Sequence, residues 1–451
     1  MKNLRETGDS LQNLIASSYE DGQFLLRMIY ENAYFQSRRN LFEFEATHQR
    51  PTIKDLEDDL RFSVLQTYLF RTAENPGSPR ILILCNDFMS EDRLYTSPFL
   101  YRRIKEYQRK GAQVDVVAFG RSKLPEVYEF DGIQVLNGYV DELSGLLSSR
   151  SYRSVGVHFF NPHMWSVIRE YLDEHTFHLF LHGYEIRNWT RSFDSTNSPS
   201  ELSQAIERSF MLMDFWRHIL DQPNFPSSFV FVSDWMRRSA EEDIGRPFPK
   251  EKSHIIHNVI DVDLFSYTKK YDDQRFKILI IRNFDKYQYG TDIALEALKI
   301  IKRSEFWPRI TVSIFGEGAG LRDFSNTFKD DHNVKVDARY LTQTEMAMEH
   351  RSSGVFLVPT RFDSQGVARD EAMSSGLVVA TNSVCAIPEF VDDSCALLAP
   401  PEDAHALATK ILALMADPAR FKALSKASAQ HVRKRLGVEQ TIQKELDLLL
   451  A

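Results

Sequence analysis

The stretch from residue 80 to residue 119 contains RILILC at 80–85, FLYRRIKEYQRKG at 99–111 and VDVVAF at 114–119. Two short, uninterrupted apolar runs flank a segment with the mixed polar and apolar pattern of a helix. Strands that are covered on both faces have such continuous runs of Val, Ile and Leu. The stretch therefore predicts a strand–helix–strand unit and, with it, a parallel sheet.

The same alternation continues along the chain and restarts once. Candidate strands of the first set lie at 154–160, 177–182 and 228–233, and those of the second set lie at 276–282, 310–318, 334–339, 355–360 and 377–382. We predict two successive Rossmann-like α/β domains, at 77–265 and 266–430, followed by a C-terminal helix at 431–451. Open sheets of this type bind ligands beyond the carboxyl ends of their strands, so functional residues should follow the strands.

Residues 1–76 show helical periodicity without strand alternation, and the turn-forming cluster ENPGSP at 74–79 separates them from the first strand. We predict a helical extension there. It is a candidate surface for a protein partner or for self-association.

Composition excludes several classes of protein. Of the 451 residues, 43% are hydrophobic and 26% are charged, which is typical of soluble globular domains. The formal net charge of −8 gives no global reason to bind nucleic acid. Three cysteines without C-x-x-C spacing indicate neither a disulfide framework nor a zinc site. The start of the chain lacks a signal-peptide pattern, so we expect a cytoplasmic protein, with peripheral membrane contact left open.

One segment, VFLVPTRFDSQGVARDEAMSSG at 355–376, combines an apolar strand, a polar loop and a helix. The helix begins near Val367, directly after Gly366. Free amides at a helix start bind anions, and glycine lets a ligand approach the backbone closely. We expect Gly366, Val367 and Ala368 to receive a phosphate or a sugar hydroxyl. An alternative role for Asp363 is to cap this helix.

Several ordered motifs resemble those of the retaining glycosyltransferase family 4, which has the GT-B fold. HNVID at 257–261 is similar to the family's Pro-Asn-Gly-Val-Asp. FGEGAG at 315–320 resembles its Gly-rich turn, and DSQGVARDE at 363–371 resembles its E-x7-E motif. The resemblance covers the chain from about residue 80 onward. It implies two domains facing a cleft, a nucleotide-sugar donor and no metal requirement.

The resemblance also implies roles for individual residues. Asp363 would contact the transferred sugar and Glu371 the ribose, while Arg282 and Lys286 would hold the donor diphosphate. The remaining donor-side positions are Gly316, Gly318, Tyr340, Leu341 and Glu389, whose alternative roles are loop packing or, for Glu389, starting a surface helix. In the first domain, His182 would lie near the donor sugar, and His158 and His163 would lie on the acceptor side.

Three positions depart from the family pattern. Asp363 replaces the usual Glu, Tyr289 replaces the Lys that normally precedes Gly290, and NDFMSEDRLYTSP at 86–98 replaces a Gly-Gly loop. Lys286 is the nearest lysine, and a solvated loop position is its alternative. The basic helix at 101–111 carries Arg102, Arg103, Lys105, Arg109 and Lys110. A solvated face is the simpler interpretation, and membrane contact is the other.

We therefore expect a retaining glycosyltransferase that moves a hexose-type sugar from UDP or GDP to a hydroxyl of a glycan or lipid-linked glycan, in surface polysaccharide or glycoconjugate synthesis. Two other hypotheses remain. The chain could be a catalytically silent GT-B subunit that binds a partner through its N-terminal helices, or a nucleotide-sugar epimerase on the same fold. Transfer assays with and without an acceptor distinguish the three.

Overall fold

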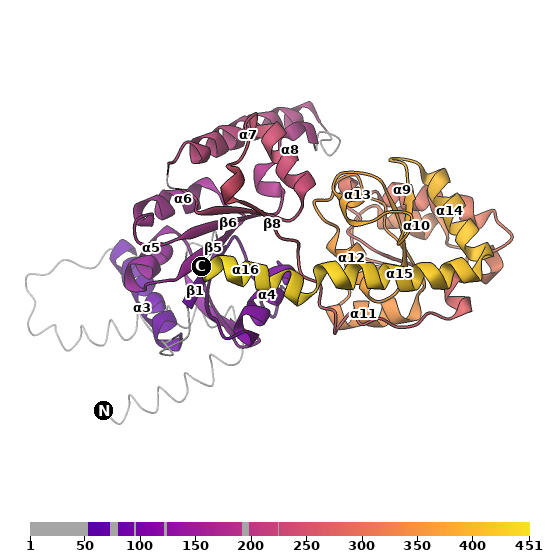
Figure 1. Cartoon of the computed structure of the whole chain (residues 1–451), viewed down its shortest axis with the longest axis horizontal. Coiled ribbons are helices and arrows are strands. Elements are labelled where there is room, and N and C mark those ends of the chain that lie inside the picture. The colour runs from indigo at the N-terminus through magenta and orange to yellow at the C-terminus, as the bar shows by residue number, and fades with distance from the viewer. Residues whose placement is uncertain (1–52, 73–79, 94–95, 121–123, 192–197, 224) are drawn as a thin grey trace, which may run out of the picture. The chain divides into compact units, whose positions relative to one another are not determined.

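The structure, a computed structural model, describes residues 53–72, 80–93, 96–120, 124–191, 198–223 and 225–451 (Figure 1). Most of the extension predicted at 1–76 lies outside these residues. Its described part is helix α3 (Ile53–Arg71). From Leu60 onward the chain is one compact unit, and Tyr68 is buried with its hydroxyl bonded to the backbone of Val116. Residues 60–71 thus pack into the first domain instead of belonging to a separate extension.

The first domain is built on an eight-stranded sheet in the order β3-β4-β2-β1-β5-β6-β7-β8. Its strands are β1 (Arg80–Cys85), β2 (Gln113–Phe119), β3 (Glu126–Phe130), β4 (Ile133–Gly138), β5 (Ser154–His158), β6 (Phe177–Leu181), β7 (Ser228–Phe231) and β8 (Ser253–Ile255). Its helices are α4 (Pro98–Arg109), α5 (Val140–Ser149), α6 (Pro162–Ile168), α7 (Pro199–Leu220) and α8 (Asp234–Ile244). All strand pairs are parallel except β3 with β4.

The antiparallel pair β3–β4 is a hairpin that the strand–helix alternation did not predict. Phe130 pairs with Ile133, so the loop consists of Asp131 and Gly132, both with positive φ (47° and 76°). An Asp-Gly pair between two strands is the usual signal for this tight turn. That signal is present in the sequence as FDGI at 130–133.

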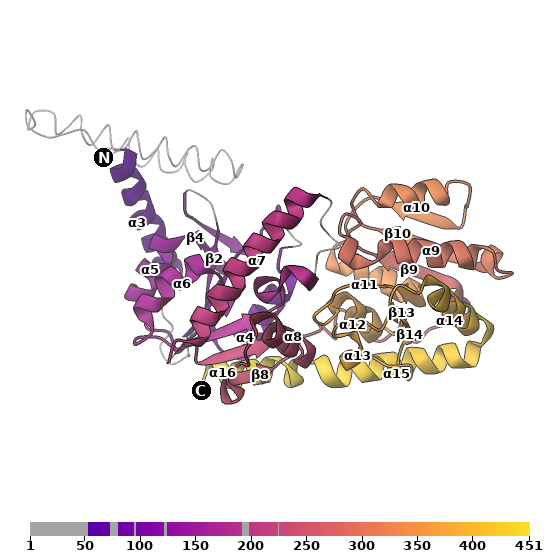
Figure 2. The same cartoon turned by 90° about the horizontal axis from the view of Figure 1, so that it is seen from above.

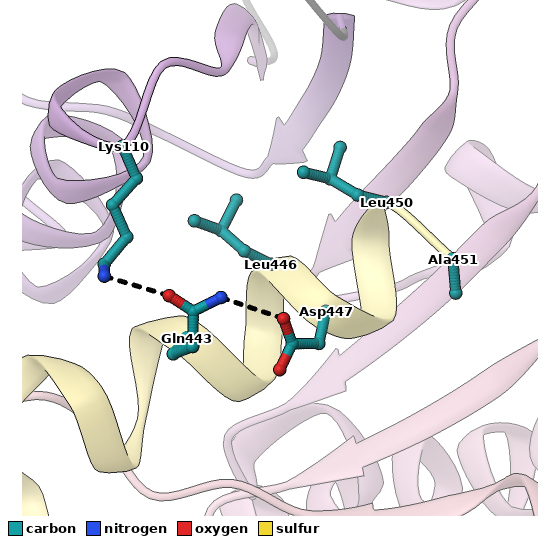
Figure 3. A pocket seen from close by; sticks show the side chains of 6 residues that line it. All are labelled: Lys110, Gln443, Leu446, Asp447, Leu450 and Ala451. Atoms are coloured by element: carbon teal, nitrogen blue, oxygen red, sulfur yellow. Dashed lines mark hydrogen bonds between the residues drawn. The ribbon is translucent and has the colours of Figure 1, made fainter.

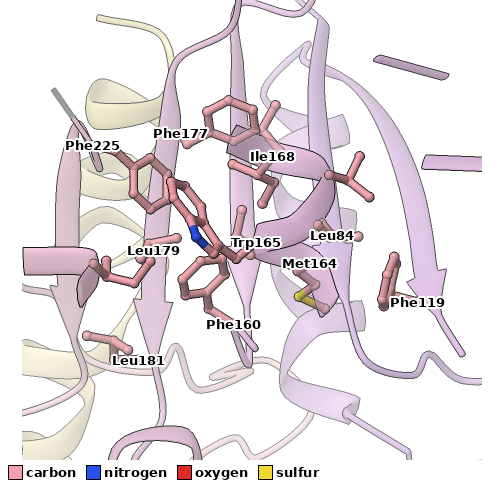
Figure 4. Close-up of a cluster of buried hydrophobic side chains, with 14 of the residues drawn as sticks. Leu84, Phe119, Phe160, Met164, Trp165, Ile168, Phe177, Leu179, Leu181 and Phe225 are labelled. Carbon is pink, nitrogen blue, oxygen red and sulfur yellow. The ribbon is translucent and has the colours of Figure 1, made fainter. Parts of the chain in front are cut away.

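The core of the first domain contains a cluster of aromatic side chains between the sheet and its helices. Trp165 of α6 lies 4.9 Å from Phe225, ring centroid to ring centroid, and packs among Phe160 and Phe177 (Figure 4). Burying such large rings gives most of the hydrophobic stabilisation of a domain. This packing fixes the strands whose carboxyl ends carry the predicted histidines.

The second domain is built on a six-stranded, fully parallel sheet in the order β11-β10-β9-β12-β13-β14. Its strands are β9 (Lys277–Ile281), β10 (Thr311–Phe315), β11 (Val334–Asp337), β12 (Val355–Leu357), β13 (Val378–Asn382) and β14 (Leu397–Ala399). Its helices are α9 (Thr291–Lys302), α10 (Leu321–Thr327), α11 (Gln343–Ser352), α12 (Val367–Ser374), α13 (Ile387–Phe390), α14 (Ala404–Ala416) and α15 (Pro418–Leu436). The prediction of two parallel-sheet α/β domains is confirmed.

The C-terminal helix α16 (Ile442–Leu449) packs against α4 and β5 of the first domain (Figures 1 and 2). Ile442 and Leu446 share a buried cluster with Ile81 of β1. Glu445 lies in the same contact and accepts hydrogen bonds from Arg103 Nε at 2.9 and 3.2 Å and from the hydroxyl of Tyr107. None of the described helices is long and apolar enough to cross a membrane.

Candidate active site

The loop between β12 and α12 places the N-terminus of α12, with its free backbone amides, at the predicted donor site. Gly366 has φ = +99°, and a Cβ there would lie 3.0 Å from the guanidinium carbon of Arg369. Both constraints require glycine at this position. Helix α12 therefore starts with its first amides at Val367 and Ala368, which are half-buried. This is the geometry expected from the sequence for an anion-binding helix start.

Asp363 lies at the start of this loop and has two local bonds. Its Oδ1 accepts from the amide of Gln365 at 3.1 Å, and its carbonyl oxygen accepts from the amide of Ala386 at 3.3 Å. The capping alternative is wrong, since the N-cap of α12 is Gly366 and no described side chain bonds to its first amides, but the carboxylate stabilises the turn before this helix. It also lies close enough to Arg282 to oppose the effect of burial on the pKa of that arginine. The bond at the turn uses only Oδ1. Oδ2 has no partner among the described residues, so the contact with a sugar that the resemblance implies is still open to it.

Arg282 directly follows β9 and points toward Asp363. Burial lowers the pKa of its guanidinium, and the carboxylate of Asp363 opposes this effect. The guanidinium lies 5.0 Å from the ring centre of Tyr289, and its Nε is buried without a hydrogen-bond partner in the described part of the chain. An arginine stays charged even when buried. Arg282 therefore keeps its positive charge and has an Nε–H that is free to donate to a ligand.

Gly316 and Gly318 hold the loop that carries Arg282. Their φ values are +143° and +132°. A Cβ at Gly316 would lie 1.7 Å from the carbonyl oxygen of Arg282, and one at Gly318 would lie 2.4 Å from the amide nitrogen of Asp285. Only glycine allows the two backbones to approach this closely. The glycine-rich turn therefore positions Arg282.

The sequence suggested Lys286 as a second cation at the donor site, but the structure places Arg369 close to Arg282. Lys286 is exposed, and its side chain has no hydrogen bond or ion pair with any described residue. Arg369, which the sequence analysis did not select, is buried and pairs with Asp370 at 2.5 Å, while its Nη1 is buried without a partner in the described structure. Its charge further lowers the pKa of Arg282, so the two guanidinium groups are close. The adjacent charges of Arg369 and Asp370 are visible in the sequence, but the burial that distinguishes them is not.

Glu371 is buried and forms an ion pair with the first domain. Its Oε1 lies 2.6 Å from Nη1 of Arg102, and Arg102 Nη2 donates to the side chain of Gln343. Burial raises the pKa of Glu371, and Arg102 opposes this shift. The expected solvated or membrane-binding face of α4 is therefore wrong for two of its arginines. Arg102 contacts Glu371, and Arg103 is buried against Glu445 and Asn258.

The two histidines at the ends of β5 and β6 contact each other. Nδ1 of His158 and Nε2 of His182 share a hydrogen bond of 2.9 Å, and their rings stack with centroids 5.2 Å apart. Burial lowers the pKa of both imidazoles, and the positive charge of Arg103 lowers it further. The pair is therefore neutral at physiological pH. The hydroxyl of Ser364 donates to the carbonyl oxygen of His182 at 2.8 Å, so the donor-side loop reaches this strand end.

His163 lies apart from this pair. It is exposed at the start of α6, and its ring centre is 5.7 Å from that of Tyr139. Its amide is bonded to the side chain of Asn161, which caps the helix. Nothing in the described structure connects His163 to His158 or His182.

Glu389 joins the two domains. Its Oε1 and Oε2 accept from the amides of Asp234 and Trp235 at 3.0 and 2.9 Å, so it caps the start of α8 in the first domain. Both carboxylate oxygens are thus engaged with the first domain, and the residue does not lie on a free surface. Ser233 strengthens the same contact by donating to the carbonyl oxygen of Ser364 at 2.7 Å.

Tyr340 and Leu341 follow β11, where the resemblance places the nucleobase. The hydroxyl of Tyr340 accepts from Nδ2 of Asn283 at 2.7 Å. The side chain of Leu341 is buried in the core, which leaves its backbone as the polar part. This is consistent with a base held through backbone contacts, and Gln343 lies just beyond.

A hollow on the surface lies elsewhere, between α4 and α16 (Figure 3). Lys110 Nζ donates to Gln443 Oε1 at 2.9 Å, and Gln443 Nε2 donates to Asp447 at 2.8 Å. The hollow contains none of the predicted site residues. Within the described residues, no group of three or more His, Cys, Asp or Glu side chains could hold a metal ion.

Comparisons with known proteins bear on two features, the fold of the chain and the family that its second domain resembles. Residues 275–417 match the family model described as glycosyl transferases group 1. Two curated relatives are each 26% identical over about a third of this chain: an uncharacterized 41.2 kDa protein in the cps region of Klebsiella pneumoniae, over 152 residues, and the sulfoquinovosyl transferase SQD2 of Arabidopsis thaliana, over 149 residues. The matched segments span 40% and 28% of those relatives' lengths.

Solved structures match over most of the chain. Sucrose-phosphate synthase from Thermosynechococcus elongatus is 16% identical, with a TM-score of 0.64, over 82% of this chain and 98% of that one. HepE from Anabaena, solved with UDP and glucose, is 14% identical with a TM-score of 0.57 over the same shares. At these identities the likeness concerns the fold. The chain has the GT-B fold, and its second domain matches the glycosyl transferases group 1 model.

Proposed function

We propose that this chain is a retaining glycosyltransferase that moves a hexose-type sugar from a UDP or GDP donor to a hydroxyl of a glycan or lipid-linked glycan. The observation that carries the proposal is the juxtaposition of Arg282, with its buried and unfilled Nε, and the open start of α12 at Gly366. Negative charge develops on the departing diphosphate, and fixed donors that face it stabilise the transition state. Nothing in this arrangement requires a metal ion.

The roles of the surrounding residues follow from their positions. The diphosphate would lie against the amides of Val367 and Ala368, with Arg282 beside it and Arg369 adding positive charge beneath Gly366. Glu371, with Oε2 free of described partners, would accept a ribose hydroxyl. The nucleobase would lie along Tyr340 and Leu341. Lys286 has no contact that places it in the site, so the proposal assigns it no essential part.

The sugar would lie between Asp363 and His182, which the bond from Ser364 to His182 brings to the same place. In the proposed step, the bond between the sugar C1 and the diphosphate oxygen breaks while the acceptor oxygen bonds to C1 on the same face. The acceptor proton passes to the leaving phosphate oxygen. The neutral imidazole of His182 can orient a sugar hydroxyl without adding charge.

An assay of Arg282→Gln tests this site. We expect transfer from UDP- or GDP-hexoses to fall about 100-fold, as for loss of one transition-state donor. Arg322→Gln, an exposed arginine of the same domain, is the matched control and should keep wild-type transfer. Wild-type transfer by the Arg282 variant would refute the site assignment.

The silent-subunit alternative predicts a different result for the wild-type chain. A silent subunit would give no transfer and no hydrolysis with any donor, whereas the proposed enzyme also gains thermal stability from UDP or GDP because ligand binding favours the folded state. Product formed without an acceptor would indicate an epimerase.

A further inference from the structure

Arg102 comes from the first domain but contacts the donor side of the second. It extends from α4, where its Nη1 lies 2.6 Å from Oε1 of Glu371 and its Nη2 donates to the side chain of Gln343 at the start of α11. Its guanidinium also lies over the ring of Phe265, 5.7 Å from the centroid. The side chains of Arg102 and Glu371 are only 9% and 6% exposed. Arg102 is therefore held in one geometry by several partners.

The carboxylate of Glu371 is only half used by this contact. Arg102 occupies Oε1, whereas Oε2 has no hydrogen-bond partner among the described residues and is not one of the fully buried unpaired atoms. A carboxylate oxygen of this kind accepts hydroxyl hydrogens strongly when the group is ionised. Arg102 also donates to Gln343, which follows the segment 340–341 proposed for the nucleobase.

We propose that Arg102 is a donor-positioning residue: by holding Oε1 of Glu371, it orients this carboxylate so that Oε2 accepts a ribose hydroxyl of the nucleoside diphosphate. This inference rests on the proposed function, because it concerns the same donor site. It adds a residue of the first domain to nucleotide binding. Donor affinity then depends on the contact between α4 and α12.

The charges around Glu371 explain why it needs this partner. Burial raises its pKa, the negative charge of Asp261 raises it further, and Arg102 opposes both. The other charged groups on neighbouring elements have partners of their own. Arg433 of α15 donates to Val262 and Ser374, His350 of α11 bonds to Ser375, and Arg369 pairs with Asp370 on α12. Without Arg102, the pKa of Glu371 would rise further, and the carboxylate would lose the partner that orients it.

The test compares nucleotide binding by Arg102→Gln, Arg102→Lys and a control. Affinities for UDP, GDP and their 2′-deoxy analogues are measured by calorimetry between pH 5 and pH 9. We expect Arg102→Gln to weaken binding of the preferred ribonucleotide about 10-fold at pH 7, the loss of one hydrogen bond to a charged group. The acid limb of its binding profile, meaning the fall in affinity as the pH drops, should move to higher pH. Its preference for the ribonucleotide over the 2′-deoxy analogue should shrink. Arg102→Lys should restore part of each. Arg109→Gln, on the exposed side of α4, should bind like wild type.

The outcomes distinguish failure of the proposed function from failure of the positioning role of Arg102. If the wild-type chain binds neither nucleotide, the proposed function fails, and this inference fails with it. If it binds one and Arg102→Gln has the same affinity and the same acid limb, the inference alone is wrong. Tighter binding by the variant would also overturn it, since Arg102 would then compete with the nucleotide. If Arg102→Gln does not fold, Glu371→Gln serves instead. The inference expects that variant to lose the acid limb, and an unchanged limb would contradict it.

Discussion

The first and second domains contribute differently charged environments to the candidate site, one neutral and one positive, although both bury basic side chains there. In the first domain, burial keeps the imidazoles of His158 and His182 neutral. In the second domain, burial lowers the pKa of Arg282 but the guanidinium stays charged. The same desolvation removes the proton from an imidazole, whose pKa lies near neutrality, and leaves it on a guanidinium, whose pKa lies far higher.

Under the proposed function, this contrast gives the two domains different roles. A diphosphate needs positive charge, which Arg282 and the start of α12 would supply in the second domain. A sugar needs oriented but uncharged hydrogen-bonding groups, which the histidine pair would supply. The ion pair between Arg102 and Glu371 and the cap provided by Glu389 connect the halves.

The largest effect should come from the backbone at the start of α12. Gly366→Ala would place a methyl group 3.0 Å from Arg369 in a residue with φ = +99°. We expect transfer to fall about 100-fold and stabilisation by UDP or GDP to disappear, because the amides would no longer face the phosphates. Enzyme assays and thermal melts measure both quantities.

The matched control is Gly111→Ala, at φ = +91° with no atom within 4 Å of the new Cβ. Both variants pay the strain of a left-handed alanine, about 1 kcal/mol in the free energy of unfolding. Only the variant at 366 should lose nucleotide binding. Equal losses of nucleotide binding by the two variants would mean that the start of α12 does not bind the phosphates.

An intermediate effect is expected in the pH dependence of stability, which tests the neutral half of the contrast. Because burial lowers the pKa of His158 and His182, the unfolded chain binds more protons than the folded chain below about pH 6.5. The free energy of unfolding should therefore fall as the pH drops through 6.5, by up to about 1.4 kcal/mol per pH unit for each imidazole. His158→Gln should make this slope shallower in denaturant titrations between pH 7 and pH 5.

His163→Gln controls for the loss of any histidine, since this side chain is exposed. It should leave the slope as in the wild-type chain. If His158→Gln has the wild-type slope as well, the histidine pair is not held neutral by folding.

The smallest effect should come from the contact between the halves. Glu389→Gln keeps the shape of the side chain but removes the charge that caps α8, so we expect a loss of about 1 kcal/mol in the free energy of unfolding. Glu305→Gln, at an exposed position of the second domain, should change it by less than about 0.5 kcal/mol. Equal melting temperatures for the two variants would show that the cap contributes nothing.

Much of the fold follows from local patterns. The apolar runs at 80–85, 114–119 and 276–282 correspond to β1, β2 and β9, because strands buried on both faces need continuous apolar residues. The β3–β4 hairpin was missed because it is an exception to that alternation and β3 is only partly buried. The helix start at Gly366 was predictable because glycine, strand end and helix pattern adjoin in sequence.

The partners of the charged side chains were not predictable in the same way. Arg102 and Glu371 are far apart in sequence, and α4 has the composition of a solvated basic helix. Arg369 could not be distinguished from a surface arginine without knowing that α12 is buried on several sides.

The sequence by itself therefore determined two α/β domains, the strand ends at which polar residues gather, and the glycine that opens α12, since each depends on residues adjacent along the chain. Only the tertiary structure decided which charges meet. Burial set the neutral state of His158 and His182, and the approach of α4 to α12 gave Glu371 its arginine. Such pairings depend on distances across the folded chain, and no local pattern encodes them.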